Sequence, residues 1–182
     1  MPQWIADNPN DATAYSQYAN ALSQLRRFDE AGAAYEKALQ FGANDTGIYN
    51  GLGQLRYFQK RWEDAVKFLS KAVELDARSS LTFGQLAYSQ MNLNRNEDAI
   101  KTYEKAFEVG IPPGANTRGL AYYNMACLYI RLKQNDKAFE TIGKAIDEGF
   151  VDRQTFETDT DLAPIRSDGR FQQILGRLPK TN

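Results

Sequence analysis

The chain has 182 residues, the length of a single ordinary domain, and its 42% hydrophobic and 25% charged content is typical of globular proteins. Its 22 lysines and arginines nearly balance 23 aspartates and glutamates, so no net field draws it to nucleic acid or acidic membranes. The sequence contains no histidine, which removes the commonest general base and the usual zinc ligand sets. It also lacks a glycine-rich phosphate loop and metal-ligand spacing. We therefore predict that it is not an enzyme and needs no cofactor and no metal.

The distribution of apolar residues bears on localisation. No stretch approaches the roughly 18 consecutive apolar residues of a membrane span, and the first residues lack the blocks of a signal peptide. We expect a soluble protein without membrane insertion, either cytoplasmic or periplasmic. The single cysteine, Cys127, can form no internal disulfide, which leaves the redox compartment open. With no histidine to activate it, we expect a small buried cysteine rather than a reactive thiol.

Residues 1–11 read as the end of a helix that Pro9 stops, because proline disfavours the helical conformation of the residue before it. We interpret this segment as the last part of a preceding helix, or as an N-terminal lead-in. On the first interpretation further sequence lies upstream.

A short pattern then recurs along the chain. The stretch 28–39, FDEAGAAYEKAL, returns in variants that start at Trp62, Asn96 and Asn135. Each copy has an alanine in its fourth place, a large aromatic or aliphatic residue four places later, and a second alanine seven places later. The first alanines are Ala31, Ala65 and Ala99, which are 34 residues apart, and Ala138, which follows after 39. A fixed period of this size indicates stacked helical repeats.

Each copy is preceded by a second helical pattern, such as Tyr15, Ala19 and Leu22 at three- and four-residue steps. Gly42 stands where a left-handed C-cap would end the second helix, and Gly149 ends the last one. The chain is thus predicted to form four helical pairs, at residues 12–45, 46–79, 80–113 and 114–149. A five-residue loop insertion precedes the fourth pair.

The full pattern, a bulky residue, Leu-Gly or an equivalent, an aromatic residue and then Ala-x3-aromatic-x2-Ala, resembles the tetratricopeptide repeat (TPR) over residues 12–149. The resemblance implies an all-α fold, a right-handed superhelical solenoid of antiparallel helix pairs. Small residues such as Ala19 and Gly53 would let helices approach closely, and larger ones would cost about 1–3 kcal/mol. Arg56 and Gln90 depart from the pattern, because they replace an apolar or aromatic residue late in the first helix of their units.

The period stops after Gly149, yet Phe171, Ile174 and Leu178 continue at helical spacing. The segment 159–171 is similar to the segments that close TPR arrays in bacterial proteins. Because the last helix of an array exposes an apolar face, we interpret residues 150–182 as a C-terminal helical cap and tail. The carboxylates in this region fit no calcium loop and are expected to cap helices or face solvent: Asp152, Glu157, Asp159 and Asp161.

The resemblance implies a non-catalytic scaffold for protein–protein interaction, with a peptide or protein segment bound in a concave groove formed by the first helices. Amides can hydrogen-bond a peptide backbone and tyrosines supply rigid contact area, so we predict a ligand with apolar anchors. The alternative for the tyrosines is packing between neighbouring helices. The same family positions also hold Gln24, Phe58 and Leu81. The groove residues that we predict are Asn20, Asn50, Gln54, Tyr57, Gln85, Tyr88, Met91, Tyr123, Asn124 and Arg131.

Two classes of partner are disfavoured. TPR proteins that hold chaperone tails clamp the terminal carboxylate with lysines, an arginine and asparagines, and only Asn20 fits that set here. The remaining clamp positions carry Ser16, Gly51, Leu81 and Gln85. The basic pairs in the expected turns are too few for a nucleic-acid stripe.

An alternative function is an interaction or regulatory region of a larger bacterial multidomain enzyme or sensor.

Overall fold

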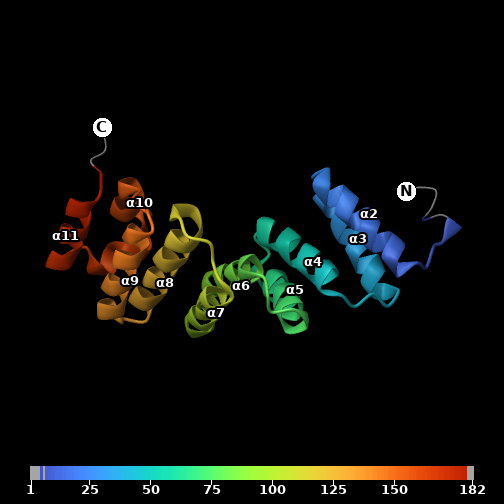
Figure 1. Ribbon diagram of the computed structural model, residues 1–182, viewed down its shortest axis with the longest axis horizontal. Helices are drawn as coiled ribbons and strands as arrows, with labels where there is room; N and C mark the ends of the chain where they lie inside the picture. Colours follow the sequence, from blue (N-terminus) through green and yellow to red (C-terminus); the bar gives the residue numbers. More distant parts are fainter. Residues whose placement is uncertain (1–4, 6, 180–182) are drawn as a thin grey trace. The chain divides into compact units, whose positions relative to one another are not determined.

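The computed structural model describes residue 5 and residues 7–179, and within them it contains helices and no strand (Figure 1). The described residues fall into two compact units, which divide between Ser89 and Gln90. Of residues 1–11, expected to be the end of a preceding helix or an N-terminal lead-in, residues 1–4 and 6 lie outside the described part. The α-helices are α2 Ala12–Gln24, α3 Phe28–Gln40, α4 Thr46–Phe58, α5 Trp62–Leu75, α6 Ser80–Asn92, α7 Asn96–Val109, α8 Leu120–Arg131, α9 Asn135–Asp147, α10 Arg153–Thr158 and α11 Gly169–Arg177.

These helices lie inside the ranges predicted for the four pairs and the cap, although the repeat boundaries themselves stay predictions. The five-residue insertion is not a plain loop. Residues Ala115–Gly119 form a π-helical turn, η1, that leads into α8. Arg118 holds this turn, because its guanidinium donates to the Ile111 carbonyl at 2.8 Å and pairs with Glu148 at 3.4 Å.

Helix starts follow local sequence signals. The Asp11 carboxylate caps α2 by accepting from the backbone N–H groups of Thr13 and Ala14, and Asp45 caps α4 in the same way. The second helices α3, α5, α7 and α9 have no side-chain cap of this kind. They carry acidic residues in the first turn instead, and these negative charges interact favourably with the positive end of the helix dipole.

The two helices of each pair are joined by three residues, of which the middle one adopts a left-handed backbone conformation. The four middle residues are Arg26, Lys60, Asn94 and Lys133, with φ between 56° and 59°. Such a conformation is unfavourable for a residue with a side chain, by roughly 1–2 kcal/mol. It recurs at the intervals of the sequence period, so the same turn is imposed on four different sequences by the packing of the helices that flank it.

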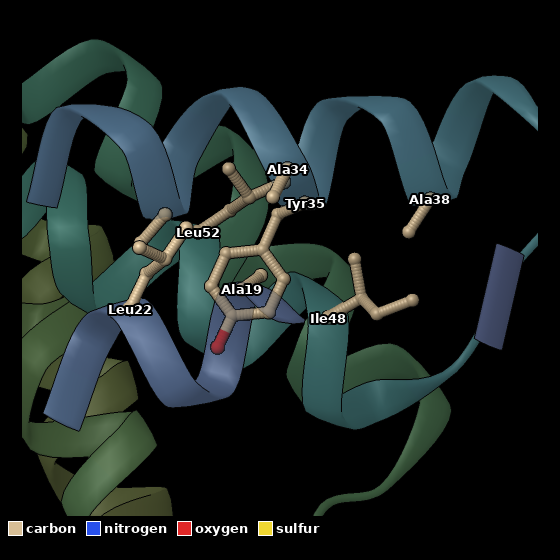
Figure 2. Close-up of a cluster of buried hydrophobic side chains, with 8 residues drawn as sticks. Ala19, Leu22, Ala34, Tyr35, Ala38, Ile48 and Leu52 are labelled. Carbon is tan, nitrogen blue, oxygen red and sulfur yellow. The ribbon is translucent and has the colours of Figure 1, made fainter. Parts of the chain in front are cut away.

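The core of the first unit is built around Tyr35 of α3. Its side chain is 2% exposed and lies among Ala19 and Leu22 of α2 and Ile48 and Leu52 of α4 (Figure 2). The ring also lies against Gly51, where an added Cβ would clash with Cζ, Cε2 and the hydroxyl oxygen of Tyr35. The large ring therefore needs small residues around it, and these let α3 approach both neighbouring helices.

Gly53 of α4 permits a second close approach, as the sequence predicted. A Cβ at this position would lie 2.6 Å from Leu69 Cγ and 3.1 Å from the Leu69 backbone nitrogen on α5. Both distances are too short, and the backbone nitrogen cannot move aside as a side chain could.

Arg56 is accommodated in α4 although its residue is only 8% exposed. Its guanidinium pairs with Glu36 at 2.8 Å and donates to Gln59 at 2.9 Å. The aliphatic part of the side chain can then fill the apolar position while the charge reaches a partner. Its Nε atom is buried without a hydrogen bond, so an arginine at this position of the repeat leaves one polar group unsatisfied.

The segment after α9 buries several large apolar side chains. Phe156, Leu162, Ile165 and Phe171 are each at most 2% exposed. Between α10 and α11 the chain forms a 3-10 helix, η2, at Thr160–Ile165, which packs against α8, whereas α11 packs against α9. The carboxylates of Asp152 and Asp159 cap α10 and η2, which confirms the expectation that they cap helices.

We expect Gly53→Ala to lower the free energy of unfolding by about 1–2 kcal/mol, because the overpacking cost of roughly 1–3 kcal/mol exceeds the gain in helix propensity. Gly84→Ala is the matched control. Gly84 is also helical, and a Cβ there meets nothing within 4 Å, so alanine should stabilise the chain by about 0.5–1 kcal/mol. Urea unfolding of both variants measures the difference. Equal effects would contradict the close approach.

Candidate functional site

The first unit contains a hollow of about 550 Å³ between α2 and α4, with Tyr35 of α3 among its walls. The residues that line it carry no lysine, arginine, aspartate or glutamate. Its polar groups are amides and hydroxyls, and its apolar groups include two phenylalanines. The lining residues are Asn20, Ser23, Gln24, Phe28, Tyr35, Gly47, Asn50, Gly51, Gln54, Leu55 and Phe58.

Hydrogen bonds from neighbouring side chains orient the two asparagines of the hollow. Asn20 Oδ1 accepts from the Tyr35 hydroxyl at 2.6 Å, and burial raises the pKa of that hydroxyl, so it stays a donor. Asn50 Oδ1 accepts from Thr82 Oγ1 at 3.0 Å. Each amide oxygen already accepts one hydrogen bond, so the N–H donors are the groups that these side chains offer most freely.

Gln24 and Gln54 complete the polar lining. Within the described part of the chain their side chains make no hydrogen bond. Each amide therefore offers a ligand both an acceptor oxygen and two N–H donors. A polypeptide backbone, with its alternating N–H and C=O groups, matches this set of groups.

The apolar end of the hollow is Phe58, whose residue is 64% exposed. Beside it lies the aromatic cluster, which we define as Tyr57, Trp62 and Tyr88. Its rings meet edge to face, with centroids 5.8–5.9 Å apart, and Tyr57 also meets Phe58 at 5.5 Å. Burial raises the pKa of Tyr57. Tyr57 and Tyr88 thus pack chiefly against other rings, whereas Phe58 presents its ring to solvent.

In the second unit, Tyr123 of α8 is only 4% exposed. Its ring lies 4.6 Å from that of Phe150 and 5.4 Å from that of Phe156. The hydroxyl donates to Asp159 at 2.7 Å, and burial raises its pKa. Tyr123 is therefore covered by the segment that follows α9.

Arg131 of α8 is engaged by the same segment. Its Nη2 and Nε donate to the two carboxylate oxygens of Asp161 at 2.7 and 3.2 Å, and its Nη1 donates to the Met91 carbonyl at 2.9 Å. Cys127 lies one helical turn from both Tyr123 and Arg131 and is 1% exposed. Burial, and then the charges of Asp159 and Asp161, raise the pKa of its thiol. The expectation of a buried cysteine is confirmed, and its low reactivity stays a prediction.

Two further predicted groove residues occupy equivalent buried positions, since Asn124 follows Gln85 by the 39-residue step. Asn124 is 8% exposed and donates to the Tyr103 hydroxyl at 3.0 Å. Gln85 is also 8% exposed, but its Oε1 has no hydrogen-bond partner. In the repeat register Leu69 stands where Tyr103 supplies the hydroxyl, so the amide of Gln85 loses that partner.

The structure thus separates the ten predicted residues into groups. Asn20, Asn50 and Gln54 come together in the hollow. Tyr57 and Tyr88 belong to the aromatic cluster, and Arg131 pairs with Asp161. The remaining four, Gln85, Met91, Tyr123 and Asn124, are buried.

Sequence reasoning missed Ser23 and Phe28, which lie at the end of α2 and the start of α3. The available signal was their position in the sequence, because they flank the turn between α2 and α3 close to the predicted groove position Gln24. It did not distinguish them from solvent-exposed turn residues.

Metal-ligand clusters and membrane-spanning helices are both absent from the described residues. No group of three or more histidines, cysteines, aspartates or glutamates in residues 7–179 could hold a metal ion. Nor is any helix in this part of the chain long and apolar enough to cross a membrane.

Comparison with known proteins places this helical-repeat scaffold in a family. Models of the tetratricopeptide repeat match residues 10–78, 82–109 and 120–148, which together exceed half of the chain. The chain belongs to the tetratricopeptide repeat family. A search of curated protein sequences gave no match.

Solved structures of TPR proteins share the fold at low sequence identity. A structure described as "YrrB: a TPR protein with an unusual peptide-binding site" has a TM-score of 0.76 at 19% identity, covering 96% of this chain and 88% of that one. The MamA protein has a TM-score of 0.74 at 21% identity, covering 91% and 87%. MamA of Desulfovibrio magneticus RS-1 has a TM-score of 0.67 at 18% identity, covering 80% and 79%. This similarity confirms the predicted fold class, an all-α superhelix of helix pairs.

The burial of Tyr123 and the exposure of Phe58 lead to opposite expectations for stability. Tyr123→Ala should lower the free energy of unfolding by about 3–5 kcal/mol, because it removes a buried ring that packs against Phe156 and Phe150. Phe58→Ala should change it by less than about 0.5 kcal/mol, as for other surface substitutions. Urea unfolding followed by circular dichroism measures both. A small effect of Tyr123→Ala would show that the residue is not part of the core.

Proposed function

We propose that the chain is a non-catalytic scaffold that binds a peptide or protein segment in the hollow of its first unit. The observation that carries the proposal is an uncharged hollow in which oriented amides lie beside an exposed phenylalanine. TPR proteins are interaction modules, and the description of YrrB as a TPR protein with a peptide-binding site supports a polypeptide as ligand.

The lining of the hollow determines the chemistry of the ligand. Transfer of a charged side chain into a site without a counter-charge is costly, so the bound stretch is uncharged. Asn20, Asn50 and Gln54 hydrogen-bond its backbone, and an apolar side chain of the ligand packs on Phe58. A terminal carboxylate, as in a chaperone tail, finds no lysine or arginine among the residues that line the hollow.

The proposal can be tested with a peptide array incubated with the full chain. The array should contain uncharged 12-residue peptides with one phenylalanine or leucine, and matched peptides in which a neighbouring residue is lysine or aspartate. We expect binding of members of the uncharged set and loss of binding in their charged counterparts. In solution, Trp62 beside the hollow reports binding by fluorescence in a Trp4→Phe background, which leaves one tryptophan.

Variants of the hollow then locate the bound peptide. Phe58→Ala should weaken the best peptide about ten- to a hundredfold, the effect of losing burial of a phenylalanine. Gln54→Ala should weaken it less. The control is Glu63→Gln, an exposed change on the neighbouring helix α5, which should leave affinity unchanged. Peptides that bind all variants equally, or an array with no uncharged binder, would refute the proposal.

A further inference from the structure

Equivalent faces of α4 and α8 differ in exposure, because the α4 face is open and the α8 face is covered by another part of the chain. Asn50, Gln54 and Phe58 of α4 occur at four-residue spacing and line the open hollow. The equivalent residues of α8, one 34-residue and one 39-residue step later, are Tyr123, Cys127 and Arg131. We call these three the α8 stripe. It is covered by the chain's own residues 159–165, which we call the 159–165 segment, and at Tyr123 also by the rings of Phe150 and Phe156.

The polar contacts of the 159–165 segment resemble those of a bound acidic peptide. Asp159 accepts from the Tyr123 hydroxyl at 2.7 Å. Asp161 forms a two-point ion pair with Arg131, at 2.7 and 3.2 Å. Such forked pairs are among the stronger hydrogen-bonded contacts. Two carboxylates of one short segment therefore bind the two ends of the stripe.

The segment also buries apolar side chains. Leu162 and Ile165 are at most 1% exposed. Cys127, at the centre of the stripe, is 1% exposed. The covered state of the stripe is therefore the dominant one.

We propose that the 159–165 segment is a ligand of the α8 stripe bound within the same chain. It forms an autoinhibitory contact that closes this face to outside polypeptide and can lift while the helices stay folded. The inference rests on the proposed function, because it takes the equivalent face of α4 to be the binding surface. A competitor for the stripe would be an acidic segment with an apolar residue next to its carboxylate, as in Asp161-Leu162.

Several features allow the segment to lift as a unit. Its regular structure is a single 3-10 helix, η2, a form with poorer hydrogen-bond geometry than an α-helix. Pro164 within it has no backbone N–H to donate. The ion pair is also partly in water, since the side chains of Arg131 and Asp161 are 27% and 25% exposed. Segments with few internal backbone bonds open locally at lower cost than whole domains.

Cys127 provides the test, because it is the only cysteine and lies buried on α8, against which η2 packs, close enough to feel the charges of Asp159 and Asp161. The rate at which a maleimide labels Cys127 in the native full chain reports how often the stripe is uncovered. We expect Asp161→Asn to raise this rate by about tenfold or more, since a hydrogen bond to a charged group contributes about that factor. The rate should depend weakly on urea between 0 and about 1 M, because local opening exposes little surface.

Two further variants separate opening of the segment from direct effects on the thiol. Removing a negative charge near Cys127 favours the thiolate, whereas removing the positive charge in Arg131→Gln disfavours it. If the segment lifts, Cys127 is labelled faster in both Asp161→Asn and Arg131→Gln than in the wild type. If charge alone acts, their rates move in opposite directions, and the proposal fails. Glu140→Gln removes an exposed ion pair with Lys144 on α9 and should leave the rate unchanged.

The urea dependence decides the remaining case. If the labelling rates of wild type and variants rise with urea as steeply as global unfolding does, Cys127 is exposed only when the fold is lost. The 159–165 segment would then be a fixed cap and not a ligand. This outcome would leave peptide binding to the first unit untouched, because that binding is measured with other residues and another readout.

Discussion

The fold depends on close contact between helices, which the chain achieves with small residues opposite large ones. Tyr35 illustrates the constraint, because its ring fills the space between α2 and α4 and leaves room only for hydrogen at Gly51. The same close packing places the Tyr35 hydroxyl under Asn20. The residue that spaces the helices thus also orients an amide of the hollow. Packing and the candidate site are in this way two consequences of one contact.

The chemistry of the hollow follows from what its walls lack as well as from what they contain. With no charged side chain among the lining residues, its specificity must come from directional hydrogen bonds and from one exposed ring. The charges of the second unit act differently. Arg131 is held by Asp161 of the same chain, so a cation that would attract acidic partners is already neutralised. The two units therefore present different surfaces to a polypeptide.

Much of the fold could be predicted from sequence because its signals are local or periodic. The alanines at 34-residue spacing, the aspartates that cap α2 and α4, and Gly53 all act on neighbours at fixed offsets. The candidate site was less predictable. Asn20, Asn50 and Gln54 line the hollow as the groove assignment suggested, but Tyr123 and Asn124 are buried. A family position indicates which way a residue points from its helix, and not what the rest of the chain places in front of it.

The sequence alone determined the repeat period, the helices and the small residues at their contacts, because these depend on spacing within one or two turns of chain. Only the tertiary structure decided which equivalent positions are open. Gln54 and Cys127 stand at matching places on α4 and α8, yet Gln54 lines the hollow while Cys127 is covered. The cause lies more than 30 residues beyond Cys127, where Asp159 and Asp161 return to α8. Exposure is a property of the whole packed chain, and no local pattern encodes it.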